Sequence, residues 1–181
     1  LITTASADVP LKGLDYSLKA LKILKKDNPN IHLIVIGSPK KGGHTERLIK
    51  DLNIKDNVFF KKHLSKEEIR KLYSTSSVAI VSSLYEGFGY PVIEAMSCEV
   101  PLIATNVSSI PELVGKYGIL IDPKDENLLS HKIKNVLSNY DEHKKTAIQG
   151  RQHIIKTFNW SKITNEYEKT IFKVIENFRK C

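Results

Sequence analysis

Six short runs of apolar and β-branched residues recur along the chain, and most of the segments between them have helical periodicity. The runs cover residues 2–5, 31–37, 57–60, 77–83, 100–105 and 118–122. Several are apolar almost throughout, which is typical of parallel strands that are covered on both faces. Alternation of strand and helix favours right-handed βαβ units. We therefore predict an α/β fold with a doubly wound, mainly parallel six-stranded sheet and helices on both faces.

The helix predictions rest on apolar spacing and on capping residues. Leucines recur at helical spacing in residues 14–26, and Ser65 with Glu68 forms a capping-box signature. After Asp122 only helical patterns remain, and they predict helices over residues 127–137, 143–158 and 161–178. Because no repeat, low-complexity tract or linker interrupts the chain, we expect residues 1–181 to form a single domain with extra C-terminal helices.

Charge and composition exclude several classes of protein. The net charge is +8, but lysines supply 24 of the 28 basic residues and are scattered along the chain. Nucleic-acid recognition favours arginine and interleaved aromatic residues, so we expect no nucleic-acid partner. No apolar run is long enough to span a membrane. Cys98 and Cys181 lie far apart and predict no disulfide, which fits a cytoplasmic location.

The histidines give no sign of a metal site. None of the six falls at the i, i+4 spacing that would present two ligands on one helix face; they occupy positions 32, 44, 63, 131, 143 and 153. We therefore expect neither a bound metal nor another cofactor.

Residues 82–105 hold more special residues than a chain reversal requires. The preceding strand ends where an open α/β sheet forms its binding crevice. Pro91 suits the first position of a helix, where its missing N–H is not needed. Gly87 and Gly89 allow the backbone to approach a ligand closely, and the N–H groups at a helix start favour a phosphate. These features predict a phosphate site.

Two glutamates flank this glycine turn. Carboxylates repel phosphates, so Glu86 and Glu94 are better suited to accept hydrogen bonds from sugar hydroxyls. A ligand that carries both phosphates and many hydroxyls is a nucleotide sugar. The alternative is that the two glycines form a plain left-handed turn with no ligand role.

The segment EGFGYPVIEAM, residues 86–96, resembles the signature of the family 4 glycosyltransferases, a large retaining group with the GT-B fold. Four further segments match that family in the same order: Leu11-Lys12-Gly13, Asn57-Val58, residues 110–114 and Phe158-Asn159-Trp160. The resemblance covers essentially the whole chain, but only the C-terminal, donor-binding half of the family. It implies a Rossmann-like domain.

The resemblance also implies roles for individual residues. Glu94 would hold the ribose of the nucleotide and Glu86 the transferred sugar, while Lys12 would neutralise the diphosphate as it leaves. Glu86 and Lys12 are thus the candidate catalytic residues. The further donor-binding candidates are Ser6, Gly87, Phe88, Gly89, Lys62 and His63. For Lys12, Lys62 and His63 the alternative is an ordinary solvated surface position.

Three positions depart from the pattern of the family. Ser6 stands where many members have an arginine, so diphosphate neutralisation would rest on Lys12 and fewer partners. Glu99 occupies a common glycine position, and Ser108-Ser109 replaces a frequent glycine pair. These departures could change donor affinity or donor choice.

The expected function is therefore binding of a nucleotide sugar for retaining, metal-independent transfer to an acceptor. The acceptor would be a glycan or a lipid-linked molecule held by an N-terminal domain, and we expect the chain to be a fragment that lacks this domain. Peripheral attachment of the full-length protein to the inner membrane face stays open. Alternatives are a nucleotide-sugar epimerase, a binding module without transfer activity, and a basic domain that binds nucleic acid.

The resemblance finally implies that the helix after Trp160 crosses back to the missing half. Without that half, we expect this helix to take one of two arrangements. It packs against its own domain, or it extends with Ile171, Val174 and Ile175 partly exposed.

Overall fold

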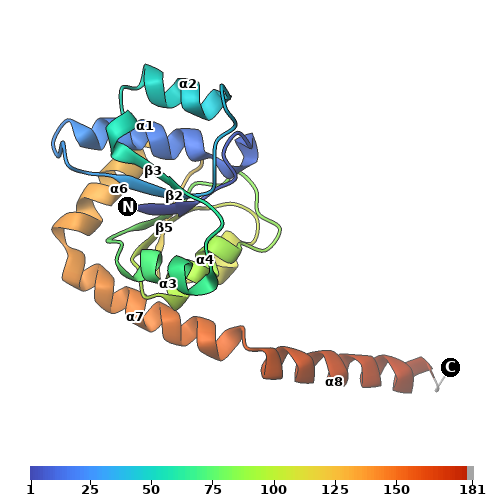
Figure 1. The fold of residues 1–181 in the computed structure, drawn as a ribbon. Coiled ribbons are helices and arrows are strands. Elements are labelled where there is room, and N and C mark those ends of the chain that lie inside the picture. Colours follow the sequence, from blue (N-terminus) through green and yellow to red (C-terminus); the bar gives the residue numbers. More distant parts are fainter. Residues whose placement is uncertain (179–181) are drawn as a thin grey trace.

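The computed structural model, which describes residues 1–178, contains one six-stranded sheet in the order β3-β2-β1-β4-β5-β6 (Figure 1). The strands are β1 Ile2–Thr4, β2 Leu33–Ile36, β3 Val58–Lys61, β4 Ala79–Val81, β5 Leu102–Thr105 and β6 Ile119–Ile121. All neighbouring strands pair in parallel, which confirms the predicted doubly wound α/β fold. The order of strands reverses between β1 and β4, the point where such sheets form a binding crevice.

Helices cover both faces of the sheet. Two 3-10 turns, η1 Pro10–Lys12 and η2 Lys55–Asn57, accompany eight α-helices among the described residues: α1 Leu14–Lys25, α2 His44–Asp51, α3 Lys66–Ser74, α4 Tyr90–Ser97, α5 Ile110–Val114, α6 Glu126–Ser138, α7 Tyr140–Thr157 and α8 Trp160–Phe178. The first hydrophobic cluster joins α1, α2 and α6 to the sheet, and the second joins α3, α4, α5 and α7 to its other face (Figure 1).

Strand β2 shows how the sheet supplies both clusters. Leu33 and Val35 are fully buried in the first cluster, whereas Ile34 and Ile36 pack against the second. Alternate residues of a strand point to opposite faces, so one short strand contributes to two cores. Strand β5 is buried at all four positions, as expected for a central parallel strand.

Two of the differences between predicted and observed element starts have a local explanation. Helix α4 begins at Tyr90, so Pro91 is its second residue, where the N–H would also lack a partner within the helix. Strand β3 begins at Val58 because Asn57 closes the preceding 3-10 turn. The side-chain amide of Asn57 donates to the carbonyls of Pro29 and Ile31, at 3.0 and 2.7 Å. That use of the side chain explains why an asparagine stands before the strand.

The capping box predicted for the third helix is present. The Ser65 hydroxyl accepts from the Glu68 N–H at 3.3 Å, and the Glu68 carboxylate accepts from the Ser65 N–H at 2.8 Å. This reciprocal pair fixes where α3 begins after the β3 loop.

Helix α8 extends away from the rest of the chain and buries none of its residues (Figure 1). The side chains of Ile171, Val174 and Ile175 are 53%, 62% and 41% exposed. The second of the two predicted arrangements is therefore the one observed. Within residues 1–178, no helix combines the length and the apolar composition needed to cross a bilayer. Cys181 lies outside the described residues.

Candidate functional site

The loop after β1 and the loop after β4 are joined by hydrogen bonds at the carboxyl edge of the sheet. The Leu84 N–H donates to the Leu11 carbonyl at 2.8 Å, and the Ser82 hydroxyl donates to the Gly13 carbonyl at 2.9 Å. Gly13 has a φ of 61°, and a Cβ atom there would lie 1.8 Å from the Ser82 carbonyl oxygen. Only glycine fits this contact, so the glycine of Leu11-Lys12-Gly13 has a structural reason.

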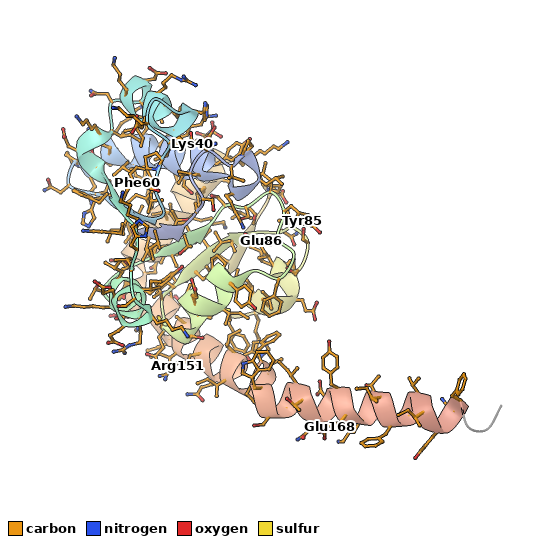
Figure 2. All side chains as sticks on the ribbon, turned by 45° about the vertical axis from the view of Figure 1, so that its right-hand side comes forward. Lys40, Phe60, Tyr85, Glu86, Arg151 and Glu168 are labelled. Carbon is orange, nitrogen blue, oxygen red and sulfur yellow. The ribbon has the colours of Figure 1, made fainter. Side chains whose placement is uncertain are left out.

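Lys12 and Glu86 face each other across the two loops. The Lys12 Nζ lies 2.8 Å from Glu86 Oε1, and the Ser83 hydroxyl donates to the same oxygen at 2.7 Å. Glu86 is only 7% exposed, whereas its neighbour Tyr85 is 60% exposed and projects from the loop (Figure 2). A carboxylate in such a position needs a cation and further donors to offset its desolvation, and Lys12 and Ser83 supply both.

The glycine turn before α4 has one glycine that the fold requires and one that it does not. Gly89 has a φ of 99°, and a Cβ atom there would lie 2.9 Å from Leu113 Cδ1. Gly87 lies outside the left-handed region, and a Cβ atom there would have no neighbour within 4 Å. The alternative of a plain left-handed turn with no ligand role therefore explains Gly89. Within the described chain, nothing requires glycine at position 87.

Free backbone donors line this turn. The N–H groups of Gly87, Phe88 and Gly89 make no hydrogen bond to any residue in the described range 1–178. The Ser109 hydroxyl stabilises the turn, because it donates to the carbonyls of Phe88 and Glu86 at 2.8 and 3.2 Å. The turn thus presents fixed donors at the start of α4, where the helix dipole also favours an anion.

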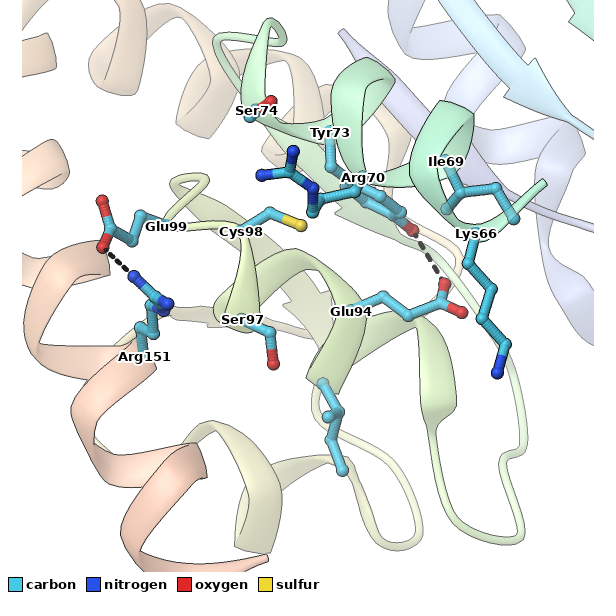
Figure 3. A pocket seen from close by; sticks show the side chains of 11 residues that line it. Lys66, Ile69, Arg70, Tyr73, Ser74, Glu94, Ser97, Cys98, Glu99 and Arg151 are labelled. Carbon is cyan, nitrogen blue, oxygen red and sulfur yellow. Dashed lines mark hydrogen bonds and ion pairs between the residues drawn. The ribbon is translucent and has the colours of Figure 1, made fainter. Parts of the chain in front are cut away.

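Glu94 lies on α4 and is half-buried beside a groove of about 550 Å³ between α3 and α4 (Figure 3). The Tyr73 hydroxyl lies 3.5 Å from Glu94 Oε2. Burial raises the pKa of Glu94 above its usual value, and the hydrogen bond from Tyr73 acts in the opposite direction. The lining residues are Lys66, Ile69, Arg70, Tyr73, Ser74, Ile93, Glu94, Ser97, Cys98, Glu99 and Arg151.

The other predicted residues lie apart from this arrangement. Ser6 is exposed just after β1, and Lys62 and His63 are exposed in the loop between β3 and α3. Their side chains make no hydrogen bond or ion pair with Lys12, Glu86 or Glu94, so the predicted contacts with a diphosphate or base remain predictions. Residues 1–178 contain no group of three or more histidine, cysteine, aspartate or glutamate side chains placed to hold a metal ion.

At two of the positions that depart from the family pattern, the backbone conformation explains why glycine is common there. Glu99 and Ser108 have φ angles of 57° and 49°, a region that glycine enters without strain. Glu99 is held there by contacts with α7: its carboxylate pairs with Arg151 at 3.0 Å, and its carbonyl accepts from Lys144 Nζ at 2.6 Å. These residues replace glycine while keeping the local turn.

Asp8 is a structural residue near the site that the sequence did not predict. Its carboxylate accepts from the backbone N–H groups of Lys40 and Thr45, at 2.7 and 2.8 Å. The hydrogen bond from the Thr45 backbone is the largest cause of a lowered pKa of Asp8, and the Lys40 N–H adds to it. Asp8 therefore connects the loop that leads to Lys12 with Lys40 of the loop before α2 and with Thr45 in the first turn of α2. Its position before a proline-containing turn was the only sequence signal.

Comparison with known proteins agrees with this geometry. Residues 1–153 match the family described as glycosyl transferases group 1. The chain is 34% identical over 181 residues to the MMP alpha-(1->4)-mannosyltransferase of Mycolicibacterium hassiacum, covering 96% of this chain and 44% of that protein. It thus spans less than half the length of this relative.

Two solved structures have the same fold. The sucrose-phosphate synthase of Thermosynechococcus elongatus superimposes with a TM-score of 0.84 and 25% identity, over 97% of this chain and 45% of that one. HepE of Anabaena, solved in complex with UDP, gives a TM-score of 0.84 with 22% identity, over 95% of this chain and 48% of that one. With the family match spanning most of its length, this chain belongs to the group 1 glycosyl transferases.

Proposed function

We propose that this chain binds a nucleoside diphosphate sugar and presents it for retaining, metal-independent glycosyl transfer. The observation that carries the proposal is the position of Lys12 beside the glycine turn, at the point where the strand order reverses. One ammonium group and the N–H groups of the turn, which have no partner among residues 1–178, offer positive charge to a diphosphate. Gly87 supports the same reading, because no contact within residues 1–178 explains the absence of a side chain.

The chemistry follows from where charge develops. Cleavage of the bond between the anomeric carbon and the diphosphate oxygen leaves the electron pair on that oxygen, so the leaving group gains negative charge. Lys12 and the start of α4 would stabilise that charge. Because Lys12 is paired with Glu86 in this structure, a bound diphosphate has to share the ammonium group with the carboxylate. Glu86 would then accept hydrogen bonds from the hydroxyls of the transferred sugar.

Glu94 is proposed to bind the ribose of the nucleotide. It stands one helical turn after the start of α4 and lines the groove between α3 and α4, whose lining includes neither Lys12 nor Glu86. The two glutamates therefore serve different parts of one extended ligand. The base would lie near Lys62 and His63.

For the whole protein we propose transfer to a glycan or lipid-linked acceptor that another domain holds. This proposal is supported by the relatives, which are about twice the length of this chain, and by the complexes of HepE with UDP and UDP-glucose. Retention of configuration rests on the resemblance to the family 4 enzymes. We also propose a cytoplasmic location, since Cys98 is a free thiol.

Calorimetry with a panel of nucleoside diphosphates and their sugar esters, with and without EDTA, tests the proposal. We expect binding of at least one nucleoside diphosphate that EDTA does not change. Binding that disappears with the chelator would contradict metal independence, and competition by polyanions in general would favour the nucleic-acid alternative. Release of free nucleoside diphosphate by the full-length protein, only when acceptor is present, would distinguish a transferase from an epimerase.

The role of a second domain has its own test. The chain and the full-length protein are assayed side by side with the same donor and acceptor. We expect turnover from the full-length protein alone, because the acceptor site would lie outside this chain. Comparable turnover by both would show that a second domain is not needed.

A further inference from the structure

A line of hydrogen bonds connects the end of β1 with Glu94 through a tyrosine. The Thr4 hydroxyl and the Tyr73 hydroxyl are 2.8 Å apart, and Tyr73 in turn reaches Glu94 Oε2 at 3.5 Å. Tyr73 is 1% exposed and packs in the hydrophobic cluster that joins α3 and α4 to the sheet. Phenylalanine would fill that space equally well, so packing does not explain the hydroxyl group.

The chemistry of the three groups determines which group donates in each hydrogen bond. An ionised carboxylate only accepts hydrogen bonds, so Tyr73 donates its single proton to Glu94. The Thr4 hydroxyl must then donate to the Tyr73 oxygen. Burial holds the pKa of Tyr73 well above its usual range, so the phenol keeps its proton.

The carboxylate of Glu94 accepts no other hydrogen bond from the described residues. The charged and titratable side chains that line the groove with it are Lys66, Arg70 and Tyr73 of α3, Cys98 and Glu99 at the end of α4, and Arg151 of α7 (Figure 3). Arg70 pairs with Glu67, Arg151 pairs with Glu99, and no cation of residues 1–178 forms an ion pair with Glu94. No described residue donates to Glu94 Oε1, which leaves that oxygen available to a ligand.

We propose that Tyr73 is a positioning residue, which holds one oxygen of Glu94 so that the other faces the hydroxyl groups of a bound nucleotide. The proposal rests on the proposed function for the identity of the ligand, but the hydrogen bond itself belongs to the free protein. The side chain of Glu94, which has three rotatable bonds, is thereby fixed before the ligand binds, and this lowers the entropy cost of binding. Thr4 fixes the tyrosine in the same way from the end of β1.

The Tyr73→Phe variant tests this role, because it removes one oxygen atom and keeps the packing. Calorimetry with a nucleoside diphosphate that the wild type binds should show about fivefold to tenfold weaker binding at neutral pH. This is less than the full effect of a hydrogen bond to a charged group, because the 3.5 Å contact is long and Tyr73 acts on the ligand only through Glu94. Binding needs ionised Glu94, and losing the donor raises its pKa. The pH below which affinity falls should therefore move upward in the variant.

A double-mutant cycle separates positioning from a general structural effect. In a Glu94→Gln background, Tyr73→Phe should cause little further loss, because the charge that it orients is gone. Equal losses in both backgrounds, with the pH midpoint unchanged, would overturn the proposal.

Tyr140→Phe, at a partly exposed tyrosine of α7, is the matched control and should bind like the wild type. If Tyr73→Phe folds poorly, Thr4→Val replaces it as the test, because it removes the hydrogen bond between Thr4 and Tyr73. It should also move the pH midpoint of binding upward.

A measurement without ligand keeps this inference separate from the proposed function. Carbon-13 NMR of the Glu94 carboxyl group reports its pKa in the free protein. An upward shift in Tyr73→Phe relative to the wild type supports the hydrogen bond even if no nucleotide binds. An unchanged Glu94 titration would show that Tyr73 does not act on this carboxylate.

Discussion

The Nζ atom of Lys12 lies 2.8 Å from Oε1 of Glu86, although 74 positions separate the two residues in the chain. The pair connects the loops that follow β1 and β4, the two strands on either side of the reversal in strand order. Both residues were predicted as catalytic candidates from different motifs. Their contact shows that the fold brings these motifs to one place.

Removing the cation should destabilise the fold. Lys12→Met leaves the buried Glu86 carboxylate with the Ser83 hydroxyl, and we expect a loss of about 2 kcal/mol in the free energy of unfolding, less than for a fully buried pair because Lys12 is partly exposed. Denaturant titration measures this. The double variant Lys12→Met with Glu86→Gln should recover part of the loss, since no charge remains unpaired. Lys145→Met, at an exposed lysine of α7, is the control. No recovery in the double variant would show that the loss has another cause.

The two glycines of the turn should respond differently to alanine. Gly89→Ala forces a side chain into a left-handed backbone and toward Leu113, so we expect a loss of about 1 to 2 kcal/mol in stability. Gly87→Ala meets no described atom and should change stability by less than about 0.5 kcal/mol. Its effect should instead appear as weaker binding of the nucleoside diphosphate. Thermal unfolding and calorimetry on the same samples check both expectations, and unimpaired binding by Gly87→Ala would count against close approach of a ligand there.

The two glutamates should divide the donor between them. Glu94→Gln should weaken binding of the bare nucleoside diphosphate, because Glu94 is proposed to hold the ribose. Glu86→Gln should spare the nucleoside diphosphate and weaken only the intact sugar donor, by roughly 1.5 to 3 kcal/mol for a hydrogen bond to a charged group. Calorimetry with both ligands decides this. Equal weakening of the bare nucleotide by both variants would refute the division.

Asp8 should stabilise the fold in a pH-dependent manner. Its pKa is lowered below the model-compound value of 3.8, so its contribution is fully present above that value and is lost as pH falls through the lower, folded-state pKa. Asp8→Asn tolerates the observed φ of 63° but removes the charge. We expect the variant to be less stable than wild type at pH 7, with the difference shrinking in strong acid. A difference that stays constant down to pH 2 would contradict a role for the ionised carboxylate.

Strands β4 and β5 were predictable because their runs are apolar almost throughout, as expected where both faces of a strand are buried. Residues 100–105, for example, contain β5, which is buried at every position. The turn at Gly87–Gly89 was predictable for a related reason, since two glycines and a proline between a strand and a helix restrict the local backbone whatever surrounds them. The start of β3 was less predictable, because the contacts of Asn57 are with residues 26 and 28 positions away.

Among the site residues, Tyr73 was not predicted. Within α3 it continues the apolar face, and only the packing of α3 against α4 brings its hydroxyl to Glu94. The role of Asp8 was missed for the same reason, because its partners lie more than 30 positions away, at Lys40 in the loop before α2 and at Thr45 in the first turn of α2. The course of α8 was left between two arrangements, since an apolar stripe predicts a buried face but does not name the surface that covers it.

The sequence by itself determined all six strands and most of the helices, and it predicted which short motifs form the site. Those properties depend on interactions within about ten residues: apolar periodicity, caps and turns. The tertiary structure alone decided that Lys12 pairs with Glu86 and that Tyr73 reaches Glu94. A hydrogen bond forms only when its two atoms come within about 3 Å, and across distant segments that distance is set by how the helices pack on the sheet.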